Sequence, residues 1–171
     1  MKGLTLRVWS SGDLPLLRAA NTAEMTAHLN GPETEEQVAD RHRRYLRLTE
    51  SGEAQMFVVE AAGAPVGTIG CWPTQWRDER ALESGWFVLP EAQGRGVASA
   101  ALALVIDRAR LHWPDRRYLT AFPAVSNAAS NGVCRRNGFT AVGTISGTFR
   151  GGELIMNEWA LDLIDDGASF P

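Results

Sequence analysis

The sequence predicts a mixed α/β fold: a central sheet of about seven mostly antiparallel strands, flanked by about four helices. Short segments in which apolar and polar residues alternate, bounded by turn residues, are typical of strands. Longer segments with capping residues and helical spacing separate the first strand from the next three, and two later strands from one another. A strand–helix–strand succession near the middle predicts one parallel pair within the sheet.

The first half of the chain begins with a strand and two helices. Alternation over residues 4–8 predicts the strand. Residues 11–13 read SGD, a stop and a helix cap, and residues 14–21 follow as a helix. Residues 34–37 have the spacing of a capping box, which predicts a helix to about residue 50. Three strands, at 55–62, 65–72 and 81–88, are expected next, with a polar loop before the third.

The second half contains the strongest helical pattern. Residues 96–112 place apolar side chains on one side of a helix. A strand at 117–122, a helix at 127–137 and strands at 139–146 and 154–161 follow. The helix at 96–112 joins the strands at 81–88 and 117–122, so those two strands are expected to be parallel.

Composition limits the class of protein. The 171 residues fit one domain, predicted over residues 1–164, with residues 165–171 as a flexible tail. A net charge of −3 argues against a protein that coats nucleic acid. The longest apolar run, residues 100–106, is too short for a membrane span, and the first residues do not read as a secretory signal. Two cysteines without a CxxC motif predict a reduced, cytoplasmic protein, and the three histidines lack the spacing of metal ligands.

A glycine-containing loop before the strongest helix predicts an anion site. Residues 93–98 read QGRGVA, so two glycines let the backbone turn its N–H groups inward. The following helix adds unpaired N–H groups and the positive end of its dipole, which suits a pyrophosphate. A tight strand-to-helix connection is the alternative interpretation. The third glycine of the dinucleotide-binding motif would fall at Ser99, and no P-loop is present, so an oxidoreductase or P-loop NTPase is disfavoured.

This segment and its surroundings resemble the GNAT superfamily of acyl-CoA N-acyltransferases. QGRGVA matches the family's Q/R-x-x-G-x-G/A loop, and residues 83–91, ESGWFVLPE, resemble the strand that precedes it. Residues 127–130, NAAS, and 137–139, NGF, resemble a signature of the ribosomal-protein-alanine acetyltransferase-like branch. The resemblance covers nearly the whole chain. It implies a sheet splayed between its two parallel central strands, with acyl-CoA in the gap.

The resemblance also implies which residues hold acetyl-CoA. Backbone groups of Phe87 and Val88 would pair with the pantetheine arm like an added strand, and Asn127 would bond a pantetheine amide. Main-chain N–H groups of the loop would hold the pyrophosphate, beside the charge of Arg95. The implied cofactor-binding residues are Phe87, Val88, Gln93, Gly94, Arg95, Gly96, Val97, Ala98, Ser99, Asn127, Ser130 and Asn131.

The implied reaction is attack of an amine on a thioester. About one alkyl amine in a thousand is neutral at pH 7, so a base that removes the proton helps. Glu83, five residues before Val88, is the candidate base; an exposed strand glutamate is the alternative. The Val88 N–H is the candidate donor to the oxyanion. Many relatives have a tyrosine as general acid where this chain has Cys134, which leaves the acid unassigned; Ser130 or solvent is a substitute.

Several side chains are candidates for the acceptor site. Trp72 and Trp76 border a predicted loop, which suggests a lid or pocket rim. Trp86 lies on the strand expected at 81–88, just before the glycine-containing loop. Core packing is the preferred interpretation for Trp86. His28 lies in the connection between the first two helices, which in relatives overhangs the acceptor; an ordinary surface histidine is the alternative.

The sequence therefore predicts a cytoplasmic, acetyl-CoA-dependent N-acetyltransferase, acting as a monomer or homodimer without metal, nucleic acid or membrane. Its acceptor is either a protein N-terminus or a small-molecule amine, because the fold does not fix the substrate. A noncatalytic, CoA-binding regulatory module is the alternative function.

Overall fold

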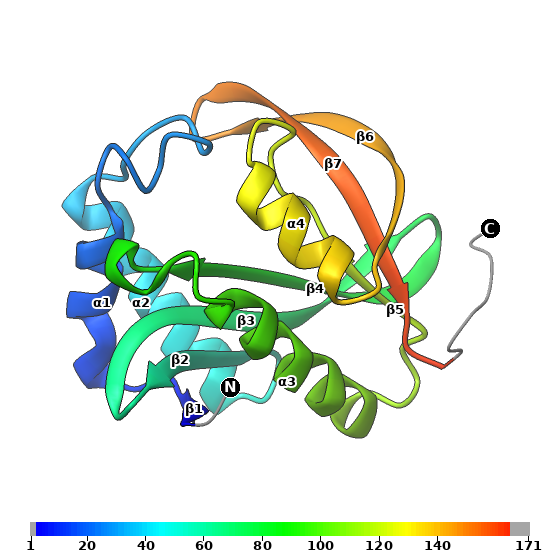
Figure 1. The fold of residues 1–171 in the computed structure, drawn as a ribbon, viewed down its shortest axis with the longest axis horizontal. Helices are drawn as coiled ribbons and strands as arrows, with labels where there is room; N and C mark the ends of the chain where they lie inside the picture. Colours follow the sequence, from blue (N-terminus) through cyan, green and yellow to red (C-terminus); the bar gives the residue numbers. More distant parts are fainter. Residues whose placement is uncertain (1–2, 165–171) are drawn as a thin grey trace.

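The computed structural model describes residues 3–164, which form one seven-stranded sheet in the order β1-β2-β3-β4-β5-β7-β6 (Figure 1). The predicted tail at 165–171 lies outside these residues. The strands are β1 (Leu4–Val8), β2 (Gln55–Ala61), β3 (Ala64–Trp76), β4 (Glu79–Val88), β5 (Tyr118–Ala121), β6 (Thr140–Phe149) and β7 (Gly152–Asp162). The helices are α1 (Leu14–Ala20), α2 (Glu35–Glu50), α3 (Val97–His112) and α4 (Ala128–Arg136), with short 3-10 turns at Ser11–Asp13 and Pro90–Ala92.

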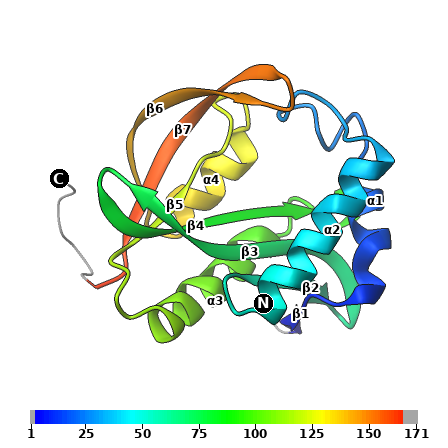
Figure 2. The same ribbon diagram turned by 180° about the vertical axis from the view of Figure 1, so that it is seen from behind.

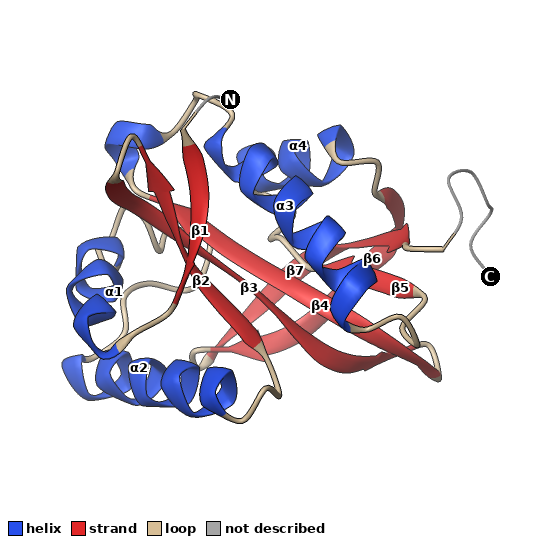
Figure 3. Cartoon of the chain, turned by 90° about the horizontal axis from the view of Figure 1, so that it is seen from below, coloured by secondary structure: helices blue, strands red, loops and turns tan. Residues whose placement is uncertain are grey.

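The helices cover the two faces of the sheet. Helices α1 and α2 lie on one face, and α3 and α4 lie on the other (Figures 2 and 3). Two hydrophobic clusters follow this division: one joins α3 and α4 to the middle of the sheet, and the other joins α1 and α2 to it. Within the described part of the chain, no helix is both long and apolar enough to cross a membrane.

The mixed sheet with its helices confirms the predicted fold class, but the predicted loop at residues 73–80 is wrong. Strand β3 continues to Trp76, and β4 begins at Glu79. A two-residue turn, Arg77 and Asp78, joins them with φ values of 48° and 65°, as hairpins of this length require. The pairing of β3 with β2 stops at Cys71, so Pro73 has no β2 neighbour. Its nitrogen faces this unpaired edge, where no N–H donor is needed.

Strands β4 and β5 are parallel, as predicted, and they separate soon after they meet. Their register consists of two pairs, Leu82 with Leu119 and Glu83 with Thr120. Strand β4 then runs on to Val88 while remaining paired with β3. The second half of β4 therefore has one edge paired and the other free of strand pairing, which confirms the predicted splay.

Gly67 holds β3 close to the end of β4. A Cβ atom there would overlap the carbonyl oxygen of Phe87 and lie 3.0 Å from the Cα of Val88. We expect Gly67→Ala to lower the free energy of unfolding by about 2 kcal/mol, because backbone rather than a flexible side chain must move. Urea denaturation measures this. Gly12→Ala is the control, since its nearest neighbouring atom is 4.0 Å away; an equal loss in both variants contradicts the prediction.

Candidate active site

The backbone of β4 turns specific groups toward the gap. The Leu89 N–H donates to the Val66 carbonyl of β3 at 2.8 Å. Because the direction of backbone groups alternates along a strand, the N–H and carbonyl of Val88 face away from β3. The Gln93 side chain confirms this direction, since its Nε2 donates to the Val88 carbonyl at 2.8 Å. The Val88 N–H is thus directed toward the edge that β5 has left.

The same alternation corrects the prediction for Phe87. Its carbonyl oxygen points at Gly67 of β3, so its backbone groups are engaged within the sheet and do not face the gap. Trp86, one residue earlier, has the same backbone direction as Val88. A chain pairing with the free edge of β4 would therefore meet Trp86 and Val88. The resemblance gave the correct strand but assigned one of its two residues to the wrong edge.

The loop at 93–96 leads into α3, whose first backbone N–H groups have no capping side chain. Gly94 and Gly96 have φ values of +71° and +77°, a conformation that glycine adopts at little cost. Gly96 is the N-cap of α3 and supplies no capping side chain. The N–H groups of the first helical turn, beginning at Val97, therefore lack side-chain caps and combine with the helix dipole into an anion site. Arg95 is exposed beside them.

Arg136 is a cationic residue at this site that the sequence analysis missed. It lies at the end of α4, and its Nε donates to the Ser99 hydroxyl in the first turn of α3 at 3.1 Å. Ser99 thereby holds a guanidinium beside the loop. The pair of arginines ending the predicted helix was the signal available in the sequence, but only the packing of α4 against α3 brings Arg136 to the loop.

Helix α4 presents Asn127 and Ser130 at its start. The Asn127 side-chain oxygen accepts the Ser130 N–H at 3.0 Å and so caps the helix. This bond leaves the Asn127 amide nitrogen without a hydrogen-bond partner in the described chain. The Ser130 hydroxyl is likewise half-buried and unpartnered there. Both groups remain available to a ligand.

Asn131 corrects another predicted cofactor residue. Its amide nitrogen donates to the carbonyls of Ala124 and Asn127, at 2.9 and 2.8 Å. Its oxygen accepts from Asn157 and from the Trp159 indole, both at 2.8 Å. Its two donor hydrogens and two acceptor positions are all occupied. Asn131 therefore ties α4 to β7 and has no hydrogen bond left for acetyl-CoA.

Cys134 is fully buried in the core cluster around α3. Burial raises the pKa of its thiol to about 12. The interpretation of this residue as a small buried side chain is confirmed, and it has no exposed surface from which to protonate a leaving group.

Glu83 lies on the opposite face of β4, toward α1 and α2. It is half-buried, and burial raises the pKa of its carboxyl, opposed by a hydrogen bond from the Trp72 side chain. Trp72 is its cross-strand partner in β3. The Trp72 ring lies over Gly85, where a Cβ would approach it to 3.1 Å, so the glycine leaves room for the indole on this face. The alternative of an exposed strand glutamate is wrong.

The other two tryptophans are not placed to face an acceptor, contrary to the prediction from the sequence. Trp76 is buried with Tyr118 and Ala160, and its indole N–H donates to Glu158, so the proposed pocket rim is a core element. Trp86 packs against the cluster on the α3 side, the core role that the sequence favoured. We correct both as acceptor-binding side chains, because one is enclosed and the other faces away from Glu83.

The α1–α2 connection, residues 21–34, runs from α1 toward the turn between β6 and β7 (Figure 1). His28 Nδ1 lies 2.9 Å from the Ser126 hydroxyl, before α4. Asn30 donates to the Phe149 carbonyl at the end of β6, at 2.7 Å. Met25 contacts the Gln93 side chain at 3.4 Å. The connection therefore joins the loop before α3, the start of α4 and the β6–β7 turn.

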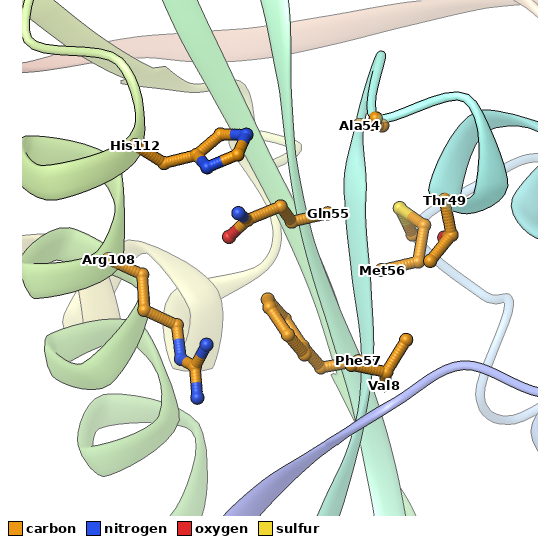
Figure 4. Close-up of a pocket in the computed structure, with 9 residues that line it drawn as sticks. Val8, Thr49, Ala54, Gln55, Met56, Phe57, Arg108 and His112 are labelled. Atoms are coloured by element: carbon orange, nitrogen blue, oxygen red, sulfur yellow. The ribbon is translucent and has the colours of Figure 1, made fainter.

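A separate pocket of about 220 Å³ lies between the ends of α2 and α3 (Figure 4). Val8, Met56, Phe57, Arg108 and His112 are among the residues that line it. Arg108 stacks over the Phe57 ring at 5.0 Å. The pocket is at the opposite end of α3 from Val97, and none of the predicted site residues lines it.

The comparisons with known proteins agree with this geometry. The family model of the acetyltransferase (GNAT) domain matches residues 3–140. No curated protein matches the sequence.

Solved structures of known acetyltransferases share the fold. A Salmonella typhimurium enzyme that modifies the N-terminal serine of ribosomal protein L7/L12 has a TM-score of 0.80 at 22% identity, covering 96% of this chain and 97% of the other. Spermidine N-acetyltransferase from Vibrio cholerae, solved with CoA and spermine, has a TM-score of 0.77 at 20% identity, with coverages of 95% and 97%. A second Salmonella typhimurium protein, solved with acetyl-CoA, has a TM-score of 0.74 at 24% identity and covers 98% of each chain.

Asn131 offers a direct test of its structural role. We expect Asn131→Ala to lower the free energy of unfolding by about 3 kcal/mol, because it leaves the buried Trp159 donor and the half-buried Asn157 donor unpaired. Ser130→Ala, one residue earlier on the same helix, is the matched control and should change stability by less than about 0.5 kcal/mol. Chemical denaturation compares the two. A stable Asn131→Ala protein that has lost affinity for acetyl-CoA would return this residue to the binding site.

Proposed function

Because the chain belongs to the GNAT acetyltransferase family, we propose that it carries out acetyl transfer at the free edge of β4, with the acceptor amine on the Glu83 face. The protein is an acetyl-CoA-dependent N-acetyltransferase that acts on an amine. Family membership favours the enzyme over a noncatalytic CoA-binding module. The observation that carries the proposal is the early separation of β4 from β5 next to a helix N-terminus without a side-chain cap.

The acetyl donor binds along two elements. The N–H groups of the first turn of α3 bind its diphosphate, with Arg95 and Arg136 as nearby cations. The backbone groups of Trp86 and Val88 pair with its pantetheine arm as an added strand would. Asn127 donates its spare amide hydrogens to the same arm. The residues fit the donor because the Val88 N–H and the Asn127 amide nitrogen are not used by the sheet or the helix; the Val88 carbonyl is already bonded to Gln93, and the Asn127 oxygen caps α4.

Glu83 accepts the proton of the attacking amine, directly or through water. Its raised pKa makes the carboxylate a better base than an exposed glutamate, since proton transfer is most effective when the catalytic pKa approaches the working pH. The Trp72 indole N–H donates to the carboxylate and opposes the rise that burial causes in the pKa of Glu83. The neutral amine nitrogen then bonds to the carbonyl carbon of the thioester.

The Val88 N–H stabilises the negative charge that develops on the carbonyl oxygen. As the new carbon–nitrogen bond forms, the carbon–sulfur bond breaks, and the CoA thiolate leaves. The nitrogen loses its second proton to solvent as it becomes an amide. The thiolate takes a proton from solvent, directly or through the Ser130 hydroxyl, which solvent then reprotonates; Cys134 is buried and takes no part. No covalent bond to the enzyme forms.

The acceptor is a protein N-terminus or a small-molecule amine, and the α1–α2 connection covers it from the side of His28. Both thiols of the described chain, Cys71 and Cys134, are free and buried, which fits the reduced cytoplasm in which we place the enzyme. We expect a monomer or a homodimer.

Acetyl-CoA binding tests the loop. We expect acetyl-CoA, but not NADH, to raise the Tm of the protein. Gly94→Trp should raise the Kd for acetyl-CoA by about tenfold or more, because the indole would occupy the space in front of the helix N-terminus. Gly52→Trp is the matched control: Gly52 also has a positive φ, +73°, and open space around its Cβ, but lies at the other end of α3. Equal affinity in the two variants refutes the loop assignment.

Glu83→Gln separates catalysis from stability. We expect kcat to fall about 100-fold. A folded-state pKa above the ordinary glutamate value means that ionised Glu83 costs stability, a cost absent at acid pH and present once pH exceeds the folded pKa. The Gln variant should therefore be at least as stable as the parent at pH 8, with its advantage lost near pH 4.

Initial rates and thermal unfolding across pH measure both effects. Glu79→Gln, an exposed position on the same strand, is the control and should change neither. Full kcat for Glu83→Gln at every pH would remove Glu83 as the base.

A further inference from the structure

Three charged side chains meet where the α1–α2 connection reaches the β6–β7 turn. Glu33 belongs to the connection, Arg41 to α2, and Arg150 to the turn. One carboxylate oxygen of Glu33 lies 2.6 Å from Arg41 Nη2 and 3.0 Å from Arg150 Nη2. The side chains of the three residues retain 13–16% of their exposure. We call this group the Glu33 cluster.

The Glu33 cluster carries one more positive charge than negative. Two guanidinium groups share one carboxylate, and no other acidic side chain of residues 3–164 forms an ion pair with either arginine. Burial lowers the pKa of Arg150; the charge of Glu33 opposes this shift, and the charge of Arg41 adds to it. Placing an uncompensated cation in such surroundings is costly unless a counter-charge is supplied.

The polar groups of the Glu33 cluster are also incompletely bonded. The Arg41 Nε and the shared Glu33 oxygen are buried, and neither has a hydrogen-bond partner within the described chain. The ion-pair contacts are short, but they are not aligned as hydrogen bonds. Buried polar atoms are usually satisfied in native proteins, so the unsatisfied Arg41 donor and the excess positive charge leave the cluster able to accept one more acceptor group.

The Glu33 cluster is connected to the proposed base. Tyr45 lies one turn after Arg41 on α2. Tyr45 packs against the hydrophobic cluster on the α1–α2 side, and Trp72 and Phe87 pack against the same cluster. Trp72 in turn bonds Glu83. The excess charge therefore lies on the same side of the sheet as Glu83.

We propose that the Glu33 cluster binds a carboxylate of the acceptor, so that the enzyme acts on amines that also carry a carboxylate. This inference rests on the proposed function, which places the amine at Glu83. The two arginines offer planar donors suited to a carboxylate, and Glu33 holds both in place. The carboxylate is either that of a free amino acid or that of an acidic side chain following a peptide N-terminus.

A purely structural role accounts for less of the arrangement. The connection is already attached to the turn by the bond from Asn30 to the Phe149 carbonyl and by the bond from Arg150 Nη1 to the Gly31 carbonyl, at 2.6 Å. A single Arg150–Glu33 pair would complete such an attachment with balanced charge. The second arginine adds charge that the attachment does not require.

Matched acceptor pairs test the proposal. With acetyl-CoA in excess, thiol release is measured for L-leucine against L-leucinamide, and for the peptide amides Ala-Asp and Ala-Asn. We expect the carboxylate member of at least one pair to have the higher kcat/KM, by about tenfold, and that pair identifies the source of the carboxylate. A carboxylate next to an ammonium makes it harder to deprotonate, so the chemistry itself favours leucinamide.

The variant Arg150→Gln provides a second test of the proposal. It should raise KM for the carboxylate acceptor about tenfold while leaving KM for its uncharged partner and for acetyl-CoA unchanged. A structural defect would alter all three. Arg43→Gln, in an exposed pair with Asp40 on α2, is the control and should change none. If Arg150→Gln does not fold, the parent protein is tested alone: N-acetyl-L-leucine should raise its Tm more than N-acetyl-L-leucinamide does.

The outcomes separate the two levels of the proposal. Equal kcat/KM within both acceptor pairs overturns the carboxylate site and leaves the acetyltransferase proposal intact. Transfer to no amine, with acetyl-CoA bound, overturns the proposed function instead.

Discussion

The separation of β5 from β4 after two paired positions is the constraint on which the site depends. A strand buried in a sheet normally satisfies both of its backbone edges. Beyond Glu83, β4 has β3 on one edge and no strand on the other, so the groups of Trp86 and Val88 need a partner from elsewhere. The Gln93 side chain satisfies the Val88 carbonyl, and the Val88 N–H is left for a substrate oxygen. The loop that supplies Gln93 also carries the glycines that begin α3, so strand end and anion site are built as one unit.

Successive side chains of β4 point to opposite faces of the sheet, and the two sets have different roles. Leu82, Trp86 and Val88 pack into the core on the α3 side, which fixes the strand against the helix that binds the diphosphate. Glu83 and Phe87 take the other side, where Trp72 lies over Gly85 and bonds Glu83. Because the period is two, any slip in register would exchange the base with a core residue. The long hairpin from Ala64 to Val88 prevents such a slip through its ten consecutive pairs.

Patterns local in sequence predicted most of the fold, and those that depend on contacts between distant segments did not. Alternation, caps and the crossover helix give the seven strands, four helices and parallel pair. The polar residues near Pro73 suggested a loop because burial of Trp76 by Tyr118 and Ala160 is invisible in the sequence. The motif that contains Asn131 is equally compatible with a cofactor-binding role and with a structural role. Only its four hydrogen-bond partners, two of them on β7, show that the role is structural. Arg136 reaches the loop through packing of α4 against α3, for which no motif exists.

The acceptor side illustrates why a family motif does not specify a substrate. The loop and strand motifs describe the donor, whose diphosphate and pantetheine are the same for every member. Groups that meet the acceptor come instead from the α1–α2 connection and the β6–β7 turn, which are more than 110 residues apart and joined by Asn30 and Arg150. Charge within such a junction is constrained by burial: one arginine and one glutamate would balance. The third charged side chain breaks that balance, and a charge removed from water without a counter-charge is costly, which is why the imbalance distinguishes a recognition site from a simple attachment.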